Sequence, residues 1–216
     1  MPDNALPRAL VTFDLGGVVI RVSSTLERAA RLARVPWRVP RHRPRQEEAT
    51  RLMVDWQVGT LRDREFFASW ADAMGGRFSA AEAERLSVAW MEGEYEGVED
   101  VVRELQERGH RLGCLSNTCG HHWDLVFRDT LKFPTLQLFR YRHASHLAGV
   151  MKPDPWIYEL YEEATGASGE EIVFFDDRDE NVRAATERGW RAFVVRPEAG
   201  PAREVRAALV SIGLLR

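Results

Sequence analysis

The stretch LVTFDLGGVV, residues 10–19, decides the fold of this chain. Its apolar residues predict a buried strand of a parallel sheet, and the Gly-Gly pair predicts a tight loop directly after it. Asp14 would then stand at the carboxyl end of that strand, where open α/β sheets bind their ligands. An aspartate before glycine is also common in ordinary turns, so the rest of the chain must decide whether Asp14 has a functional role.

The composition indicates a globular chain without special partners. Its 216 residues, 44% of them hydrophobic, suffice for one sizeable core with a small appended unit. A net charge of −3 creates no field for nucleic acid, and no apolar run approaches the roughly 18 residues of a membrane span. Residues 1–8 lack the apolar core of a signal peptide, and Cys114 and Cys119 suit reduced thiols. We expect a cytoplasmic enzyme or binding domain; the oligomeric state stays open.

Strands and helices alternate in the second half of the chain. Residues 98–108 are predicted as an amphipathic helix ended by Gly109, and residues 111–115 as a strand. Further strands are predicted near 136–141, 172–175 and 191–195, and further helices near 123–128, 155–166, 179–189 and 201–215. This alternation indicates a right-handed, doubly wound parallel sheet, a Rossmann-like α/β fold.

Residues 21–96 show a different pattern. Their large apolar residues recur at helical spacing and no strand is evident, which predicts a set of helices. Because this segment follows the first strand directly, the helices would form a small cap above the carboxyl edge of the sheet. We therefore expect an α/β core of residues 1–20 and 97–216, with residues 21–96 inserted as the cap.

Polar residues follow three of the predicted strands. They are Asp14, the pair Ser116-Asn117 and the pair Asp176-Asp177, and Lys152 stands in a loop before a helix. The carboxyl ends of parallel strands share one edge of the sheet, so these groups can converge. Carboxylates in one crevice repel unless a proton or a metal neutralises them, and an all-oxygen set favours Mg²⁺. A cation facing a lysine, a hydroxyl and an amide describes a phosphate site.

At this point the chain resembles the haloacid dehalogenase superfamily, most of whose members are phosphohydrolases. The four motifs occur in the order of that family: FDLGGV (13–18), LSNT (115–118), MKPD (151–154) and VFFDD (173–177) followed by Asn181. The motif sequences DLGG, LSNT and FFDD are most similar to those of the bacterial subgroup that contains α-D-glucose-1-phosphate phosphatase. The resemblance covers nearly the whole chain.

The resemblance implies a metal site and a nucleophile. By position, Asp14 is the nucleophile and a metal ligand, and the backbone carbonyl of Gly16 is a second ligand. Asp177 would ligate Mg²⁺, while Asp176 would either ligate it or orient a bound water.

The resemblance also implies a phosphate site and an activity. Ser116 and Asn117 would hold the transferring phosphoryl group, and Lys152 would neutralise its charge and position Asp14. The implied activity is Mg²⁺-dependent hydrolysis of small phosphorylated metabolites, a sugar 1-phosphate among them, through an aspartyl phosphate on Asp14.

Gly16 departs from the usual phosphatase motif, which has a second aspartate there as general acid and base. Such a group typically contributes about 10²–10⁴-fold in rate. Its absence leaves three alternatives open: a good leaving group, a substitute such as His121 or His122, or a protein that binds a phosphate ligand without turnover. A 2-haloacid dehalogenase also lacks this aspartate, although its metal-free chemistry does not need paired acids.

Two further groups near the predicted site have alternative interpretations. Trp56 and Trp123 either pack in the core or line a substrate pocket. The basic residues of segment 38–45 form either a solvated face or an attractive surface for an anionic substrate; they are Arg38, Arg41, His42, Arg43 and Arg45.

Overall fold

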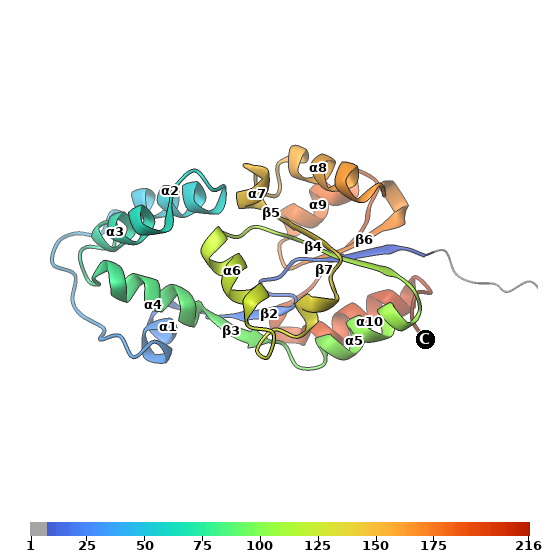
Figure 1. Ribbon diagram of the computed structural model, residues 1–216, viewed down its shortest axis with the longest axis horizontal. Helices are drawn as coiled ribbons and strands as arrows, with labels where there is room; N and C mark the ends of the chain where they lie inside the picture. The colour runs from blue at the N-terminus through green and yellow to red at the C-terminus, as the bar shows by residue number, and fades with distance from the viewer. Residues whose placement is uncertain (1–7) are drawn as a thin grey trace, which may run out of the picture.

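A computed structural model describes residues 8–216 of the chain. Its main sheet has five strands in the order β5-β4-β1-β6-β7, and every neighbouring pair is parallel (Figure 1). The predicted α/β fold with a parallel sheet is confirmed. The predictions on a signal peptide and on the first seven residues of the core lie outside the described residues.

The first strand occupies the centre of this sheet. The strands are β1 (Leu10–Phe13), β4 (Arg111–Ser116), β5 (Tyr141–Ala144), β6 (Ile172–Asp176) and β7 (Arg191–Val194). The helices of the same unit are α5 (Val98–Glu107), α6 (Gly120–Arg128), α7 (Ser145–Ala148), α8 (Pro155–Thr165), α9 (Asp179–Glu187) and α10 (Pro201–Ser211). Within residues 8–216, none of the helices has both the length and the apolar character needed to cross a membrane.

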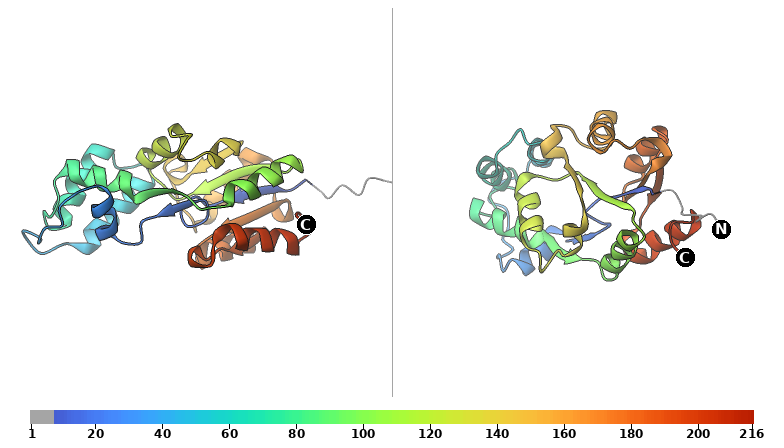
Figure 2. Two further views of the ribbon diagram at one scale, coloured as in Figure 1. Left: turned by 90° about the horizontal axis from the view of Figure 1, so that it is seen from below. Right: turned by 45° about the vertical axis from the view of Figure 1, so that its right-hand side comes forward.

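Helices cover both faces of the sheet, with α5 and α10 on one side and α8 and α9 on the other (Figures 1 and 2). The alternation of side chains along β1 explains both layers, because successive residues point to opposite faces. Val11 and Phe13 belong to the buried cluster that contains α5 and α10. Leu10 belongs to the cluster that contains α8 and α9. With both faces covered, a continuous apolar strand is the expected sequence.

Four helices between β2 (Ile20–Val22) and β3 (Met91–Glu94) form the helical insertion, which lies at the left in Figure 1. They are α1 (Leu26–Leu32), α2 (Gln46–Gln57), α3 (Asp63–Ala73) and α4 (Ala80–Trp90). The insertion buries two apolar clusters of its own, one around Trp56 and Phe66 and one around Phe78 and Leu86. The division into a core and a cap at the stated boundaries stays a prediction.

The expectation that residues 21–96 contain no strand is wrong. β2 and β3 pair antiparallel and form a small second sheet where the chain enters and leaves the helical insertion. The sequence of β3, MEGE, has a glycine and two charged residues, which are depleted in strands. Its strand structure comes from pairing with β2, so local propensity could not reveal it.

The strand expected near 136–141 is displaced. Residues Thr135–Leu138 form a 3₁₀ turn, and β5 begins only at Tyr141, which pairs with Gly113 of β4. Leu136 and Phe139 are apolar because they fill the core below α5 rather than because they form a strand. The helix expected at 123–128 starts earlier, at Gly120, where the Sγ atom of Cys119 accepts a hydrogen bond from the backbone of His122.

Candidate active site

The ends of three neighbouring strands form the site. Asp14 directly follows β1, Ser116 is the last residue of β4, and Asp176 is the last residue of β6. Because β1 lies between β4 and β6, these ends meet at one edge of the sheet. The Asp14 N–H donates to the carbonyl of Phe175 at 2.8 Å, which holds Asp14 beside the end of β6.

Three carboxylates lie together at this edge. One oxygen from each of Asp14, Asp176 and Asp177 lies within 4.8 Å of the others. Asp14 and Asp176 are buried and Asp177 is half-buried. Three carboxylates and the single ammonium group of Lys152 leave two negative charges when all are ionised. A hard divalent cation fits this set of oxygen atoms in charge and in ligand type.

Lys152 is fully buried among these acids. Its Nζ donates to Asp176 Oδ2 at 2.6 Å and to the carbonyl of Leu115 at 2.6 Å, and lies 3.3 Å from Asp14 Oδ1. Burial alone lowers the pKa of Lys152, but the two carboxylates outweigh it and the net shift is upward. Lys152 therefore remains charged and fixes the position of the Asp14 carboxylate.

The electrostatic environment of Asp14 favours a cation. Burial raises the pKa of Asp14 to about 7; Lys152 opposes this shift, and the charges of Asp176 and Asp177 add to it. Burial also raises the pKa of Asp177, with the charge of Asp176 as the second cause. Both carboxylates thus hold their negative charge at a cost that a bound cation would remove.

Asp176 has most of its hydrogen-bonding capacity occupied. Oδ1 accepts from the N–H of Arg178 and from Nδ2 of Asn181, both at 2.9 Å. Oδ2 accepts from Lys152 at 2.6 Å and from Asn181 at 3.1 Å. Asp177, the half-buried member of the cluster, is freer to ligate a metal. Sequence reasoning missed this role of Asn181, although its place in the first turn of α9, five residues after Asp176, was a usable signal.

Ser116 and Asn117 follow each other at the end of β4 and have different environments. Ser116 is buried, and its hydroxyl lowers the pKa of Asp14 through a hydrogen bond. The side chain of Asn117 bonds to the backbone of Lys152, donating from Nδ2 and accepting at Oδ1, each at 2.8 Å. Both residues border the chamber described next, and their predicted role in binding phosphate stays a prediction.

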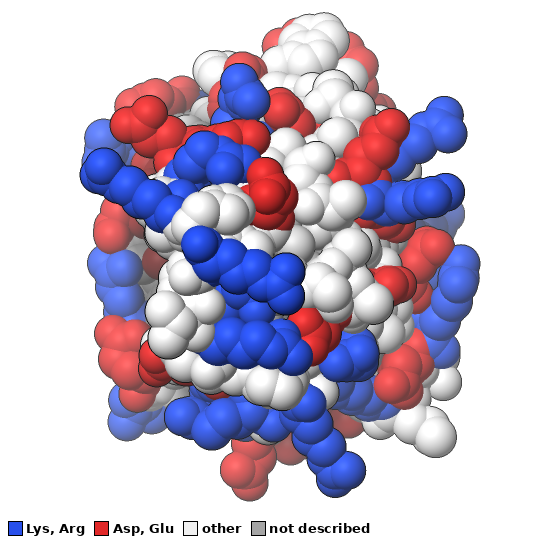
Figure 3. Space-filling view, turned by 90° about the vertical axis from the view of Figure 1, so that its left-hand side faces the viewer, with Lys and Arg blue, Asp and Glu red and all other residues white. Residues whose placement is uncertain are grey.

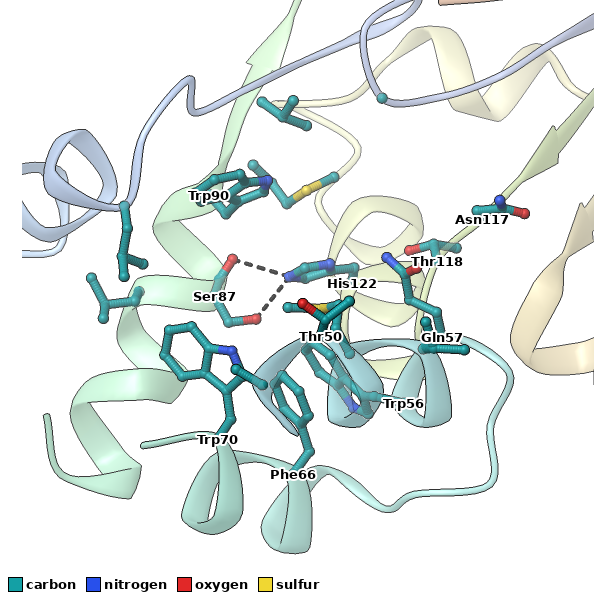
Figure 4. A pocket seen from close by; sticks show the side chains of 18 of the residues that line it. Thr50, Trp56, Gln57, Phe66, Trp70, Ser87, Trp90, Asn117, Thr118 and His122 are labelled. Atoms are coloured by element: carbon teal, nitrogen blue, oxygen red, sulfur yellow. Dashed lines mark hydrogen bonds between the residues drawn. The ribbon is translucent and has the colours of Figure 1, made fainter. Parts of the chain in front are cut away.

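A chamber of about 620 Å³ opens beside these residues (Figure 4). It extends from Gly16, Ser116 and Asn117 into the space between α2, α3 and α4. Trp56 lines it, as one of the two interpretations of this residue expects. Trp123 is not among the described residues that line it; its ring packs on Phe127 with centroids 4.4 Å apart.

The two histidines considered as substitute acids differ in position. His122 lines the chamber, and its Nε2 lies 2.7 Å from Ser87 Oγ. Burial lowers the pKa of His122 to about 4, so the ring is neutral near pH 7 and lacks an acidic proton. His121 lies beside Asp63, 4.0 Å from a carboxylate oxygen, and is not among the described lining residues. Burial raises the pKa of Cys119 to about 12, which opposes a role as nucleophile.

The basic segment 38–45 lies on the end face of the helical insertion, where basic and acidic side chains are mixed (Figure 3). Arg38 pairs with Glu82 at 2.8 Å, and Arg45 pairs with Glu48 at 2.5 Å and with Asp72 at 2.6 Å. None of the segment's basic residues is among the described residues lining the chamber. The interpretation as a solvated, ion-paired face fits this arrangement.

Comparison with known proteins finds a mycobacterial relative. A Mycobacterium tuberculosis protein named Phosphatase MT3486 is 31% identical over 141 residues, which is 64% of this chain and 63% of that protein. The match thus spans less than two thirds of the relative's length.

Solved structures show the same fold. A HAD family enzyme from Bacteroides thetaiotaomicron, solved with magnesium and inorganic phosphate, superposes with a TM-score of 0.68 at 21% identity, covering 87% of this chain and 93% of that one. A HAD-like hydrolase from Porphyromonas gingivalis gives 0.72 at 23% identity, covering 89% and 93%. The L-2-haloacid dehalogenase PA0810 gives 0.63 at 19% identity, covering 90% and 88%.

The family model described as haloacid dehalogenase-like hydrolase matches residues 9–189, which include all four motifs and every residue of the acidic cluster. The chain therefore belongs to the haloacid dehalogenase-like hydrolases.

Proposed function

We propose that this hydrolase is a Mg²⁺-dependent phosphomonoesterase with Asp14 as its nucleophile. The observation that carries the proposal is the cluster of Asp14, Asp176 and Asp177 around a single buried lysine, which leaves two negative charges when all four groups are ionised. The phosphatase name of the mycobacterial relative and the magnesium and phosphate in the Bacteroides structure support it. The resemblance to the glucose-1-phosphate phosphatase subgroup stays a prediction, as does a cytoplasmic location.

The residues present fit a magnesium site. Asp14, Asp177 and the backbone carbonyl of Gly16 would hold the ion, while Asp176, whose oxygens are already bonded, would orient Lys152 or a bound water. When bound, Mg²⁺ supplies the positive charge that lets a carboxylate approach a phosphate dianion.

The reaction then proceeds in two steps on Asp14. One carboxylate oxygen attacks phosphorus, and the bond to the ester oxygen breaks with its electron pair leaving on that oxygen. Lys152, 3.3 Å from Asp14 Oδ1, would hold Asp14 in place, and Ser116 would donate to the phosphoryl oxygens. Water then attacks phosphorus, releases phosphate and restores the carboxylate of Asp14.

Phosphate release from p-nitrophenyl phosphate tests this function, since nitrophenolate leaves without a proton donor. We expect turnover with Mg²⁺, none with excess EDTA, and a loss of at least about 10³-fold for Asp14→Asn. A protein that binds phosphate without turnover would show a thermal shift with phosphate and Mg²⁺ but no release.

A haloacid dehalogenase is the rival enzyme, because dehalogenases are among the similar solved structures and Gly16 replaces the usual acid. Chloride release from 2-chloropropionate in the presence of EDTA would establish the rival. The crowding of Asp176 and Asp177 beside Asp14 is the observation against it, because attack on carbon needs no metal.

A further inference from the structure

The chamber beside Asp14 has apolar walls that are only partly covered (Figure 4). Six half-buried side chains that line it are Val22, Leu26, Met53, Trp70, Met74 and Trp90. Apolar surface left open in a concave site gains most from covering by an apolar ligand. The volume of about 620 Å³ lies within the range of small-molecule sites.

Polar side chains are a minority of the residues that line the chamber, and some already have partners; they are Gln46, Thr50, Gln57, Ser87, Ser116, Asn117, Thr118, His122 and Arg178. Nε2 of His122 lies 2.7 Å from the hydroxyl oxygen of Ser87 and 3.1 Å from its carbonyl oxygen, so these groups satisfy each other (Figure 4). Among the described lining residues, Arg178 alone carries an ionic charge, and it is paired with Glu180 at 2.6 Å. Apolar side chains therefore make up most of the lining that a ligand would contact.

A sugar or another polyol does not match these walls. Each hydroxyl that leaves water must find a partner in the site, and a hydroxyl without one weakens binding. Met53, Trp70 and Trp90 would face several hydroxyls with hydrocarbon, apart from one indole N–H on each tryptophan. An aromatic group would instead pack on these side chains and expel the water that covers them.

The absence of a proton donor restricts the leaving group in the same direction. Gly16 has no side chain, and the His122 ring is neutral and bonded to Ser87. The departing oxygen must then carry its negative charge unaided. A phenol, with a pKa near that of tyrosine at about 10, does this far better than an aliphatic alcohol.

From the apolar chamber and the missing acid together, we propose that the substrates are aryl phosphomonoesters, with phosphate on a phenolic oxygen of an apolar aromatic group. The inference rests on the proposed phosphatase function and names its substrate class. Asp14 forms a bond to phosphorus, the bond from phosphorus to the phenolic oxygen breaks, and the phenolate leaves with the electron pair and takes a proton from solvent. Water then cleaves the aspartyl phosphate.

A matched substrate panel tests the class. We compare kcat/KM for phenyl phosphate, 1-naphthyl phosphate, glycerol phosphate and glucose 1-phosphate with saturating Mg²⁺. We expect both aryl esters to exceed both polyol esters by at least about 100-fold, since the polyols lack both the apolar fit and the leaving group. The naphthyl ester should exceed the phenyl ester by about tenfold, because its second ring adds apolar contact at similar leaving-group acidity.

A variant of the chamber wall separates recognition from reactivity. Met53→Gln keeps the length of the side chain and suits α2 while making the wall polar. We expect it to remove the preference for naphthyl over phenyl phosphate. Leu32→Gln is the matched control, because Leu32 is 52% exposed on α1 and is not among the described residues lining the chamber. An unchanged naphthyl preference in Met53→Gln would overturn the role of the apolar wall.

Gly16→Asp tests the leaving-group argument. A Cβ at Gly16 would meet only Val22 Cγ1, at 3.7 Å, so a side chain can start there without a clash. We expect the ratio of kcat/KM for glycerol phosphate to kcat/KM for phenyl phosphate to rise about 100-fold, whatever the substitution does to the overall rate. Equal changes for both esters would overturn the argument.

The outcomes also separate this inference from the proposed function. Wild-type activity on glucose 1-phosphate equal to that on the aryl esters overturns the substrate class and leaves the phosphatase intact. No release from any ester, while chloride is released from 2-chloropropionate, overturns both.

Discussion

The side-chain amide of Asn117 holds the backbone of Lys152 through two hydrogen bonds, each 2.8 Å long. The two residues lie 35 positions apart, so the loop after β4 fixes the loop that carries the lysine. The ammonium group of Lys152 in turn lies 3.3 Å from Asp14 Oδ1. The position of Asp14, the proposed nucleophile, therefore depends on Asn117, although no described hydrogen bond joins the two side chains.

Asn117→Ala removes both bonds to Lys152. We expect a loss of about 1–3 kcal/mol in the free energy of unfolding, because partly buried backbone groups lose their partners. We also expect kcat for p-nitrophenyl phosphate to fall about tenfold with KM little changed, since Lys152 becomes less well positioned. Gln137→Ala, which truncates an exposed amide, is the control. A rise in KM alone would instead support the prediction that Asn117 binds substrate.

The two glycines after Asp14 should respond differently to the same substitution. A Cβ at Gly17, whose φ is +78°, would lie 2.4 Å from Asp177 Oδ2, whereas one at Gly16 meets only Val22 Cγ1 at 3.7 Å. We expect Gly17→Ala to displace Asp177 and cost at least about 1–2 kcal/mol from its backbone conformation alone. Gly16→Ala should stay near wild type in stability.

The rise in Tm that Mg²⁺ causes can be compared in the same two variants. Differential scanning fluorimetry with and without 5 mM MgCl₂ should show a rise in Tm for Gly16→Ala and none for Gly17→Ala. Equal shifts in both variants would contradict the proposal that Asp177 ligates the metal.

Substitutions of the two neighbouring aspartates of the fourth motif should have different effects on the stability of the protein. Asp176→Asn breaks a fully buried pair with Lys152, and we expect it to cost about 3–5 kcal/mol in the free energy of unfolding. Asp177→Asn should leave the metal-free protein as stable as wild type or more so, because it removes one charge from a repelling cluster. It should also abolish the Mg²⁺-dependent rise in Tm. Urea unfolding in EDTA gives the first comparison, and a loss of stability in Asp177→Asn as large as in Asp176→Asn would refute it.

The pH dependence of stability should contain a contribution from His122. Its pKa is lowered from 6.5 to about 4 in the folded protein, mainly by burial. Between these values the unfolded chain binds a proton that the folded chain does not, so stability falls as the pH drops from about 6.5 to 4. The contribution is constant above pH 6.5. Other histidines, His143 among them, shift in the same direction, so the slope must be compared with that of a variant.

His122→Gln removes this titrating group. Urea unfolding of wild type and variant between pH 4.5 and 8 should give a shallower loss of stability in the variant on the acid side. The slope is the test, because the loss of the contact with Ser87 lowers stability at every pH. Parallel curves for the two proteins would show that His122 is not buried as described.

Much of the fold follows from local patterns in the chain. The apolar run of β1, the glycines after it and the alternation of strands with helices predict a parallel sheet, and β1, β4, β6 and β7 lie close to their predicted positions. The candidate residues also follow, because the carboxyl ends of parallel strands share one edge. The strand that the sequence misses and the one that it misplaces both depend on contacts between distant residues. β3 forms by pairing with β2, and the apolar residues before β5 fill the core below α5 instead of forming a strand.

By itself, then, the sequence determined the sheet and the identity of the acids, lysine and hydroxyl at its edge, because a strand's periodicity and its last residue are local properties. Only the tertiary structure decided which of these groups already have hydrogen-bond partners within the protein. It binds Asp176 to Lys152 and Asn181, and binds Asn117 to the backbone of Lys152. It also brings α2, α3 and α4 over the sheet edge to form an apolar chamber. Hydrogen bonds and cavities join residues that are distant in the chain, and their partners are set only when the chain packs.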